Sequence, residues 1–143
     1  MIAKFFRLIL LMQLVLPIAS HAQSEAVSNG LNWLKANQAA DGSWSSAQSS
    51  STDYYTTVSV LDSLAAFGET TSTAYTNGLS WARNVSVEGT TYLAPRVRAV
   101  AASGGDATTD LNTLLAYYNA GYGWGGDTGH STSIFHTAVG LQL

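Results

Sequence analysis

Two glycine–tryptophan turns, one in each half of this 143-residue chain, constrain its fold more than any other feature. The first turn ends at Trp44 and the second at Trp124, and the separation from Trp44 to Thr57 equals that from Trp124 to Thr137. A layout that recurs along a chain is typical of stacked helical arrays. One helical hairpin cannot bury its own apolar face, so we expect such units to stack on their neighbours.

Two further matches indicate the size of the repeated unit. Residues 54–57 (Tyr-Tyr-Thr-Thr) lie opposite residues 134–137 (Ile-Phe-His-Thr) in the register set by the two tryptophans. In a second, shorter register, residues 30–33 (Gly-Leu-Asn-Trp) match residues 78–81 (Gly-Leu-Ser-Trp). The unit is therefore predicted to be a helical hairpin of about 40 to 50 residues.

The spacing of apolar residues between the glycine-rich turns predicts helices, and no convincing period-two run predicts a strand. Caps for three of the helices are expected at Thr52 or Asp53, at Thr71 or Ser72, and at Asp106 or Thr108. The expected helices cover about residues 24–37, 53–67, 72–83, 91–103 and 108–119, and a last apolar segment follows Ser131. The second helix carries apolar residues on two sides, which indicates an inner layer. The predicted fold is all-α: about three stacked hairpins over residues 23–143, the last one truncated.

The first turn has a specific sequence. Residues 38–44 read Gln-Ala-Ala-Asp-Gly-Ser-Trp, and this stretch resembles the Gln-x-x-x-Gly-x-Trp repeat of the prenyltransferase and squalene cyclase superfamily. The second copy, residues 119–124, lacks the glutamine but keeps glycine and tryptophan, and residues 131–138 resemble the start of an inner helix of that family. The resemblance implies an arc of an α/α toroid, in which outer helices surround inner ones.

The repeat motif comprises residues expected to have structural roles. Gln38 is expected to reach free N–H groups at the start of the next helix, and Trp44 to shield that hydrogen bond from water. The predicted structural residues are Gln38, Asp41, Gly42, Trp44, Gly123 and Trp124.

The catalytic signatures that accompany this fold in the resembled family are not found in the sequence. Its cyclases use an aspartate-rich acid motif, whereas the aspartates of this chain are scattered. Its protein prenyltransferases hold zinc with Asp, Cys and His, and this chain has no cysteine to complete that set. We therefore predict no catalytic residue, no metal site and no cofactor.

Three residues at the starts of predicted inner helices are candidates for facing a ligand: Asp53, Tyr54 and His136. Asp53 has a sufficient alternative role as a helix cap. His136 is interpreted as a partly buried histidine, because a metal site demands more ligands than one. Pairing His136 with His130, which precedes it in a glycine-rich loop, is the alternative left open.

The N-terminus has the three-part order that is typical of a secretory signal. Two cations, Lys4 and Arg7, precede an apolar run, and Ser20-His21-Ala22 supplies small residues for cleavage after Ala22. A membrane anchor is the alternative, but a dozen apolar residues is short of the roughly 20 that span a bilayer. We therefore predict a protein that is secreted or at the periplasm or cell surface, with no stable membrane span after cleavage. Loss of Lys4 and Arg7 takes the formal net charge from −3 to −5.

Two classes of function follow. The first is a secreted noncatalytic repeat module, with a binding or structural role toward an unknown protein, glycan or apolar ligand. The second is an N-terminal fragment of a terpenoid cyclase or prenyltransferase-like enzyme whose catalytic residues lie outside this segment. Nucleic acid is not an expected partner, because the net charge is negative and no basic cluster occurs. A partial ring would expose apolar surface, so self-association is also expected.

Overall fold

A computed structural model describes residues 24–45 and 52–143 of the chain. The predicted signal, residues 1–22, and the serine-rich residues 46–51 lie outside the described residues. The chain divides into a unit that ends at Asn37 and a second unit from Gln38 to Leu143.

The described part of the first unit is a single helix over residues 24–36, close to the predicted bounds. Asn37 closes this helix. Its backbone N–H donates to the carbonyl of Trp33 at 3.0 Å, and its side-chain amide donates to the same carbonyl at 2.8 Å. These bonds satisfy a carbonyl that the last turn of a helix otherwise leaves unpaired.

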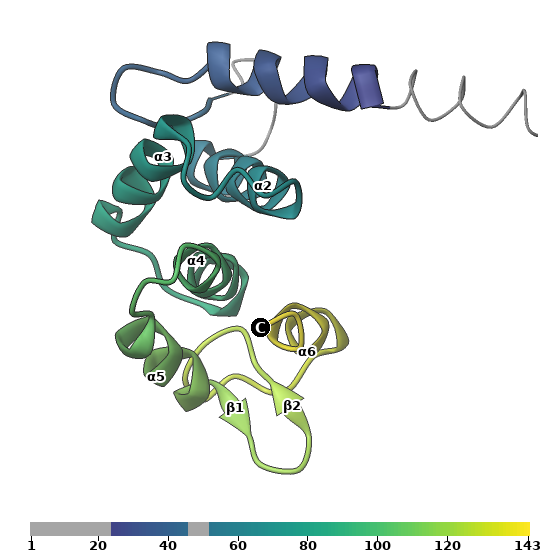
Figure 1. The fold of residues 1–143 in the computed structure, drawn as a ribbon. Coiled ribbons are helices and arrows are strands. Elements are labelled where there is room, and N and C mark those ends of the chain that lie inside the picture. The colour runs from purple at the N-terminus through teal and green to yellow at the C-terminus, as the bar shows by residue number, and fades with distance from the viewer. Residues whose placement is uncertain (1–23, 46–51) are drawn as a thin grey trace, which may run out of the picture. The chain divides into compact units, whose positions relative to one another are not determined.

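The second unit is built from five helices and one short strand pair among its described residues (Figure 1). The predicted all-α class with stacked helices is confirmed. The helices are α2 (Asp53–Ala66), α3 (Thr73–Asn84), α4 (Thr90–Ala102), α5 (Thr108–Ala116) and α6 (Ile134–Gly140), and the strands are β1 (Tyr118–Asn119) and β2 (Gly123–Trp124).

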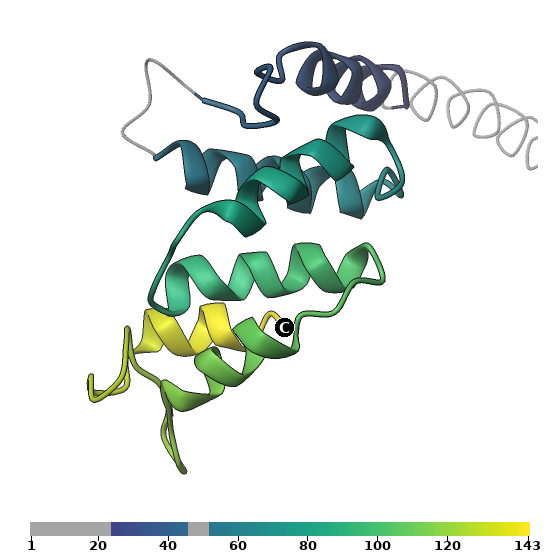
Figure 2. The same ribbon diagram turned by 90° about the vertical axis from the view of Figure 1, so that its left-hand side faces the viewer.

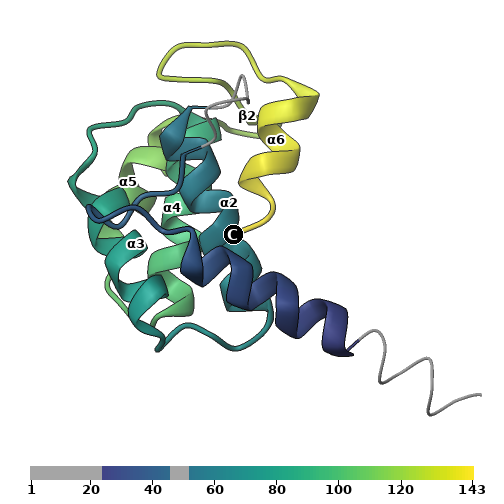
Figure 3. The ribbon, with the colours of Figure 1, turned by 90° about the horizontal axis from the view of Figure 1, so that it is seen from above.

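Successive helices of the second unit alternate between two layers. Helix α4 contacts α2 on one side and α6 on the other, while α3 packs against α2 and α4, and α5 packs against α4 (Figure 2). Viewed from above, α3 lies to one side of α2, and α6 lies to the other (Figure 3). The layer of α2, α4 and α6 therefore holds helices that are adjacent in space but separated in sequence by a helix of the other layer.

The core of this unit follows the predicted two-sided burial of α2. Val58, Leu61 and Leu64 of this helix are almost completely buried, as α2 packs against both α3 and α4. Tyr75 of α3 and Leu93 of α4 are buried to the same degree. A helix that is apolar on two faces is thus accommodated by neighbours on two faces.

Side-chain hydroxyls cap three helices, each by accepting the N–H three residues further on. The pairs are Thr52 with Tyr55, Ser72 with Tyr75 and Ser133 with His136, at 3.1–3.2 Å. Of the alternatives predicted, Thr52 rather than Asp53 caps α2, and Ser72 rather than Thr71 caps α3. At the start of α5, the carboxylate of Asp106 accepts the N–H of Thr108 at 2.9 Å.

The prediction that the fifth helix reaches Asn119 is wrong. Helix α5 ends at Ala116, and Tyr118 and Asn119 pair with Trp124 and Gly123 as an antiparallel hairpin. Glycines with φ of +83° and +114°, at 121 and 123, let the chain reverse within a few residues. Strands of two residues are too short to produce a recognisable period-two pattern.

Candidate functional site

The turn over residues 38–44 is built around the side-chain amide of Gln38. Its Nε2 donates to the carbonyls of Gly42 and Ala74, at 2.8 Å each. Gln38 was expected to meet N–H groups at a helix start, and that prediction is wrong. In α2 and in α3, the N–H of the third residue is already bonded to the capping hydroxyl, and a backbone carbonyl can accept a second hydrogen bond. The amide therefore ties the turn to the first turn of α3.

Asp41 and Gly42 shape the same turn. The carboxylate of Asp41 accepts the backbone N–H of Ser43 at 3.0 Å and its hydroxyl at 2.7 Å. Both hydrogen bonds lower the pKa of Asp41, and the bond from the backbone N–H of Ser43 has the larger effect. Gly42 has φ of +95°, and a Cβ there would lie 2.6 Å from the carbonyl oxygen of Asn77. Both the conformation and the space therefore require glycine.

Trp44 and Thr57 form a buried bracket between the turn and α2. The N–H of Trp44 donates to Oγ1 of Thr57 at 2.9 Å, and this hydroxyl donates back to the carbonyl of Trp44 at 3.3 Å. Thr57 is fully buried, and the indole of Trp44 packs on Gly78, where a Cβ would lie 2.5 Å from Cζ3 of the indole. The close packing of the ring on α3 thus depends on the absence of a side chain at Gly78.

The second turn repeats the first hydrogen bond of this bracket. The N–H of Trp124 donates to Oγ1 of Thr137 at 3.1 Å. A Cβ on Gly123 would overlap Oγ1 of Thr137, so the close approach depends on glycine. The indole N–H of Trp124 donates to the carbonyl of Leu114 at 3.1 Å, which joins the hairpin to α5.

The three candidates for facing a ligand lie in different environments. Asp53 is exposed in the first turn of α2. Tyr54 is buried, and its hydroxyl donates to the carbonyl of Tyr92 at 3.1 Å. His136 is half-buried at the start of α6, where its Nδ1 lies 2.7 Å from Oγ of Ser133. These candidates do not form a single site.

Two buried tyrosines have raised pKa values. Burial raises the pKa of Tyr54 to about 12, although the nearby positive charge of Arg96 acts in the opposite direction. Burial also raises the pKa of Tyr75 to about 12, and its hydroxyl donates to the carbonyl of Ala99 at 2.7 Å. Desolvation opposes formation of a phenolate in each case, so both tyrosines act as neutral hydrogen-bond donors.

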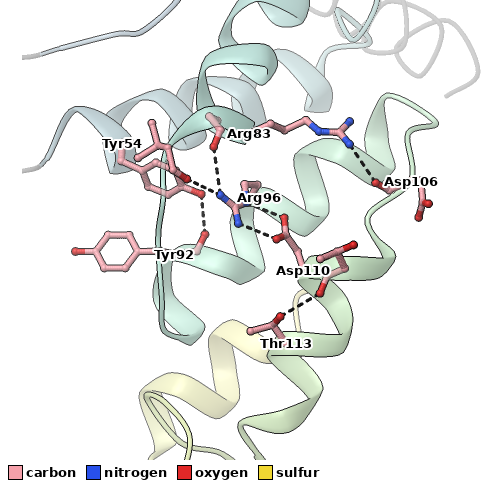
Figure 4. A network of polar contacts seen from close by, with 10 residues as sticks. Tyr54, Arg83, Tyr92, Arg96, Asp106, Asp110 and Thr113 are labelled. Carbon is pink, nitrogen blue, oxygen red and sulfur yellow. Dashed lines mark hydrogen bonds and ion pairs between the residues drawn. The ribbon is translucent and has the colours of Figure 1, made fainter.

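A buried arginine, Arg96, organises an extended polar network (Figure 4). Its Nε and Nη2 each donate to one oxygen of Asp110 at 2.7 Å, and its Nη1 donates to the carbonyls of Val85 at 2.8 Å and Ala82 at 3.4 Å. The guanidinium thus ties α4 to α5 and to the end of α3. Sequence reasoning missed this pair, because the rest of α4 and a glycine turn separate Arg96 from Asp110.

Arg98 lies outside this network. It pairs with Asp62 of α2 and donates to Oε1 of Gln142 at 2.9 Å. Arg96 and Arg98 therefore bind separate carboxylates and do not form a shared anion site.

Two hollows lie beside the Arg96 network and the strand hairpin. One, of about 190 Å³, is lined by Arg83 of α3, Arg96 of α4, Asp110 of α5 and, from the turn before α5, Asp106. The other is an open groove of about 440 Å³ beside the strand hairpin. We call it the aromatic groove; its main side chains are Leu115, Tyr118, Tyr122, Trp124 and Leu141.

Within residues 24–45 and 52–143, no group of three or more His, Cys, Asp or Glu side chains is arranged to hold a metal ion. Helices in the same part of the chain are all too short or too polar to cross a bilayer. Comparisons with protein families, curated proteins and solved structures return no match to this chain. Its function is therefore inferred from the geometry described above.

Proposed function

We propose that this chain is a secreted noncatalytic repeat module with a binding or structural role, whose hairpins form an arc of an α/α toroid like that of the prenyltransferase and squalene cyclase superfamily. The observation that carries the proposal is the recurrence of one hydrogen bond, from Trp44 to Thr57 at 2.9 Å and from Trp124 to Thr137 at 3.1 Å. Each bond joins a glycine-containing turn to a helix of the layer formed by α2, α4 and α6: the Trp44 turn to α2, and the Trp124 turn to α6.

The alternation of layers supports the arc. Helices α2, α4 and α6 contact one another in succession, and α3 and α5 pack outside them. An outer helix followed by an inner helix is the unit of an α/α toroid. The proposal predicts that each further hairpin adds one helix to each layer.

A noncatalytic role is supported by how the polar side chains are used. The guanidinium of Arg96 bonds to Asp110 and to two backbone carbonyls, and the hydroxyl of Tyr54 bonds to a third. The amide of Gln38 likewise bridges two carbonyls. These groups hold helices and turns together, which is the role expected of side chains in a scaffold.

The aromatic groove is the surface best suited to a partner. Tyr122 is 82% exposed at the tip of the hairpin and Leu141 is 71% exposed at the end of α6, and the rings of Tyr118 and Trp124 also line the groove. The centres of the Tyr118 and Trp124 rings lie 4.9 Å apart. Among a protein, a glycan and an apolar ligand, such a lining favours apolar side chains of a protein or an apolar ligand.

Tryptophan fluorescence, to which Trp124 contributes together with the three other tryptophans of the chain, tests this role. Titration with a prenyl alcohol, and separately with an oligosaccharide, should change the emission in the first case. Tyr122→Ala and Leu141→Ala should weaken that response at least fivefold. Leu143→Ala is the matched control, since Leu143 is also exposed but does not line the groove. Equal responses in all three variants would contradict binding in the groove.

The alternative function, a fragment of a terpenoid cyclase or prenyltransferase-like enzyme, makes a different prediction. An enzyme would require an aspartate-rich or cysteine-bearing inner helix encoded downstream of Leu143. Sequencing the transcript across this position distinguishes the two functions. Incubating the encoded protein with an isoprenoid diphosphate should release no diphosphate if the module is noncatalytic.

Export is tested by expressing the chain from Met1 in a secreting host. Mass spectrometry of the medium or periplasm should find a product that begins at Gln23. A secreted product that retains Met1, or retention of the whole chain in the membrane, would contradict cleavage after Ala22.

A further inference from the structure

The rings of two histidines lie beside Gly126, in the glycine-rich segment between β2 and α6. A Cβ built on Gly126 would lie 3.3 Å from Nε2 of His136 and 3.4 Å from Nδ1 of His130. The two ring nitrogens thus lie around the same small volume. Both lie within 3.4 Å of the position that a side chain at Gly126 would occupy.

The backbone beneath this space is held by hydrogen bonds from the core. The buried Thr90, at the start of α4, donates from its hydroxyl to the carbonyl of Gly125 at 2.6 Å and from its N–H to the carbonyl of Gly126 at 2.9 Å. A Cβ on Gly125 would overlap the carbonyl oxygen of His130, so the two parts of the loop touch only because glycine stands there. The loop is thus closed on itself and anchored to the core.

Each histidine is also positioned by its own contacts. Ser133 holds Nδ1 of His136 at 2.7 Å, which leaves Nε2 as the ring nitrogen that faces Gly126. Among the residues that the structure describes, no hydrogen bond to Nε2 is found. At His130 the backbone N–H donates to the carbonyl of Asp127 at 3.1 Å, and its carbonyl accepts the side-chain amide of Asn119 at 3.1 Å. A hydrogen bond to the second ring nitrogen is the usual way in which proteins orient a ligating histidine.

We propose that His130 and His136 bind one divalent transition-metal ion, such as Zn²⁺ or Ni²⁺, through Nδ1 and Nε2, and that water completes the coordination. Imidazole nitrogens suit these ions and bind zinc at about 2.0–2.1 Å. The exposed ring of His130 turns toward His136 to close the pair, and the missing side chain at Gly126 leaves room for the ion. The sequence favoured no metal site, and this arrangement supports the two-histidine alternative. With two protein ligands, the site binds more weakly than the three- and four-ligand sites of zinc proteins.

Calorimetric titration of the untagged full chain with Zn²⁺ and with Ni²⁺ tests the site. We expect saturable binding of one ion per chain, reversed by EDTA. His130→Ala and His136→Ala should each lower the affinity at least tenfold. Thr128→Ala is the matched control, because Thr128 is an exposed residue of the same loop that carries no imidazole, and its loss should leave the affinity unchanged.

A second variant keeps both imidazoles and removes only the space. Gly126→Ala places a methyl group 3.1–3.4 Å from the two rings and should also weaken binding at least tenfold. Circular dichroism without metal checks that each variant is folded. In the unaltered chain, the imidazole NMR signals of His130 and His136 should shift together as zinc is added.

Three outcomes would overturn the proposal. They are the absence of saturable binding, an affinity that depends on Thr128 as much as on the proposed ligands, and zinc-induced shifts at only one of the two rings. The NMR measurement needs no substitution, so it decides the matter even if a variant does not fold. The site is independent of the role proposed for the aromatic groove.

Discussion

Both carboxylate oxygens of Asp110 accept hydrogen bonds from the guanidinium of Arg96, each at 2.7 Å. The arginine side chain is 10% exposed and the aspartate side chain 22% exposed, so the pair is largely shielded from water. Removing one partner of such a pair leaves the other charge in a poorly solvated place. The two residues come from α4 and α5, and their contact joins successive helices of different layers.

Asp110→Asn should therefore lower the free energy of unfolding by about 2–4 kcal/mol, slightly below the range for fully buried pairs because Asp110 is partly exposed. Chemical denaturation measures the change. Asp62→Asn is the control: it breaks the more exposed pair with Arg98, whose side chains are 23% and 37% exposed, and should cost about 0–1 kcal/mol. Equal losses in the two variants would contradict a special role for Arg96.

Gly78→Ala should destabilise the protein by about 1–3 kcal/mol, because its methyl group would overlap the buried indole of Trp44. Ser80→Ala, at an exposed position of the same helix, controls for helix propensity and should change the unfolding free energy by less than about 0.5 kcal/mol. The comparison is made by thermal and urea melting. A stabilised Gly78→Ala variant would show that the indole does not pack against this position.

Thr57→Val should cost about 1–3 kcal/mol, because the buried N–H of Trp44 loses its acceptor while the side-chain volume hardly changes. Thr137→Val should change stability in the same direction but by less, since Thr137 is only half-buried. Urea denaturation of the two single variants gives both numbers. If either valine stabilised the protein, the threonine that it replaces would not have the hydrogen-bonding role described here.

Stability should fall as the pH rises from about 10 to 12. The unfolded chain releases the protons of Tyr54 and Tyr75 near pH 10, whereas the folded chain keeps them until about pH 12. The unfolded state thus binds fewer protons in this window, and the contribution present below pH 10 is lost as the pH passes the folded pKa. Tyr54→Phe and Tyr75→Phe should each make the decline shallower, relative to their own stability at pH 8. Urea midpoints across pH 8–12 measure the slope, and a steeper decline in either variant would contradict the raised pKa values.

The sequence predicted the helices well because most of them combine an apolar stripe with a capping residue or a glycine stop. Gly68, with φ of +77°, follows the end of α2, and the apolar pattern that includes Val58 and Leu61 places that helix inside. The motif residues of the first turn also came from sequence, although the role of Gln38 did not. An amide both donates and accepts, so its partner is decided by which backbone groups are already bonded, and a sequence does not show this.

Contacts between residues distant along the chain were the ones that sequence reasoning missed. Arg96 meets Asp110 only after two helices fold back on each other. This pair has no periodicity that a window of sequence could detect. Local patterns determine helices, whereas such pairs depend on how the helices and loops pack.

Helix α4 contacts α2, α3, α5 and α6, and so every other described helix of this unit rests on it. Opening of α4 would expose apolar residues of all four neighbours at once, whereas α6, at the end of the stack, can detach alone. Amide protons of Leu93, Val97 and Val100 should therefore exchange with solvent only through unfolding of the whole unit, while those of Ala138 and Val139 exchange through a cheaper local opening. Within this unit, α6 is thus expected to lose protection before α4, which should be the last of the described helices to open.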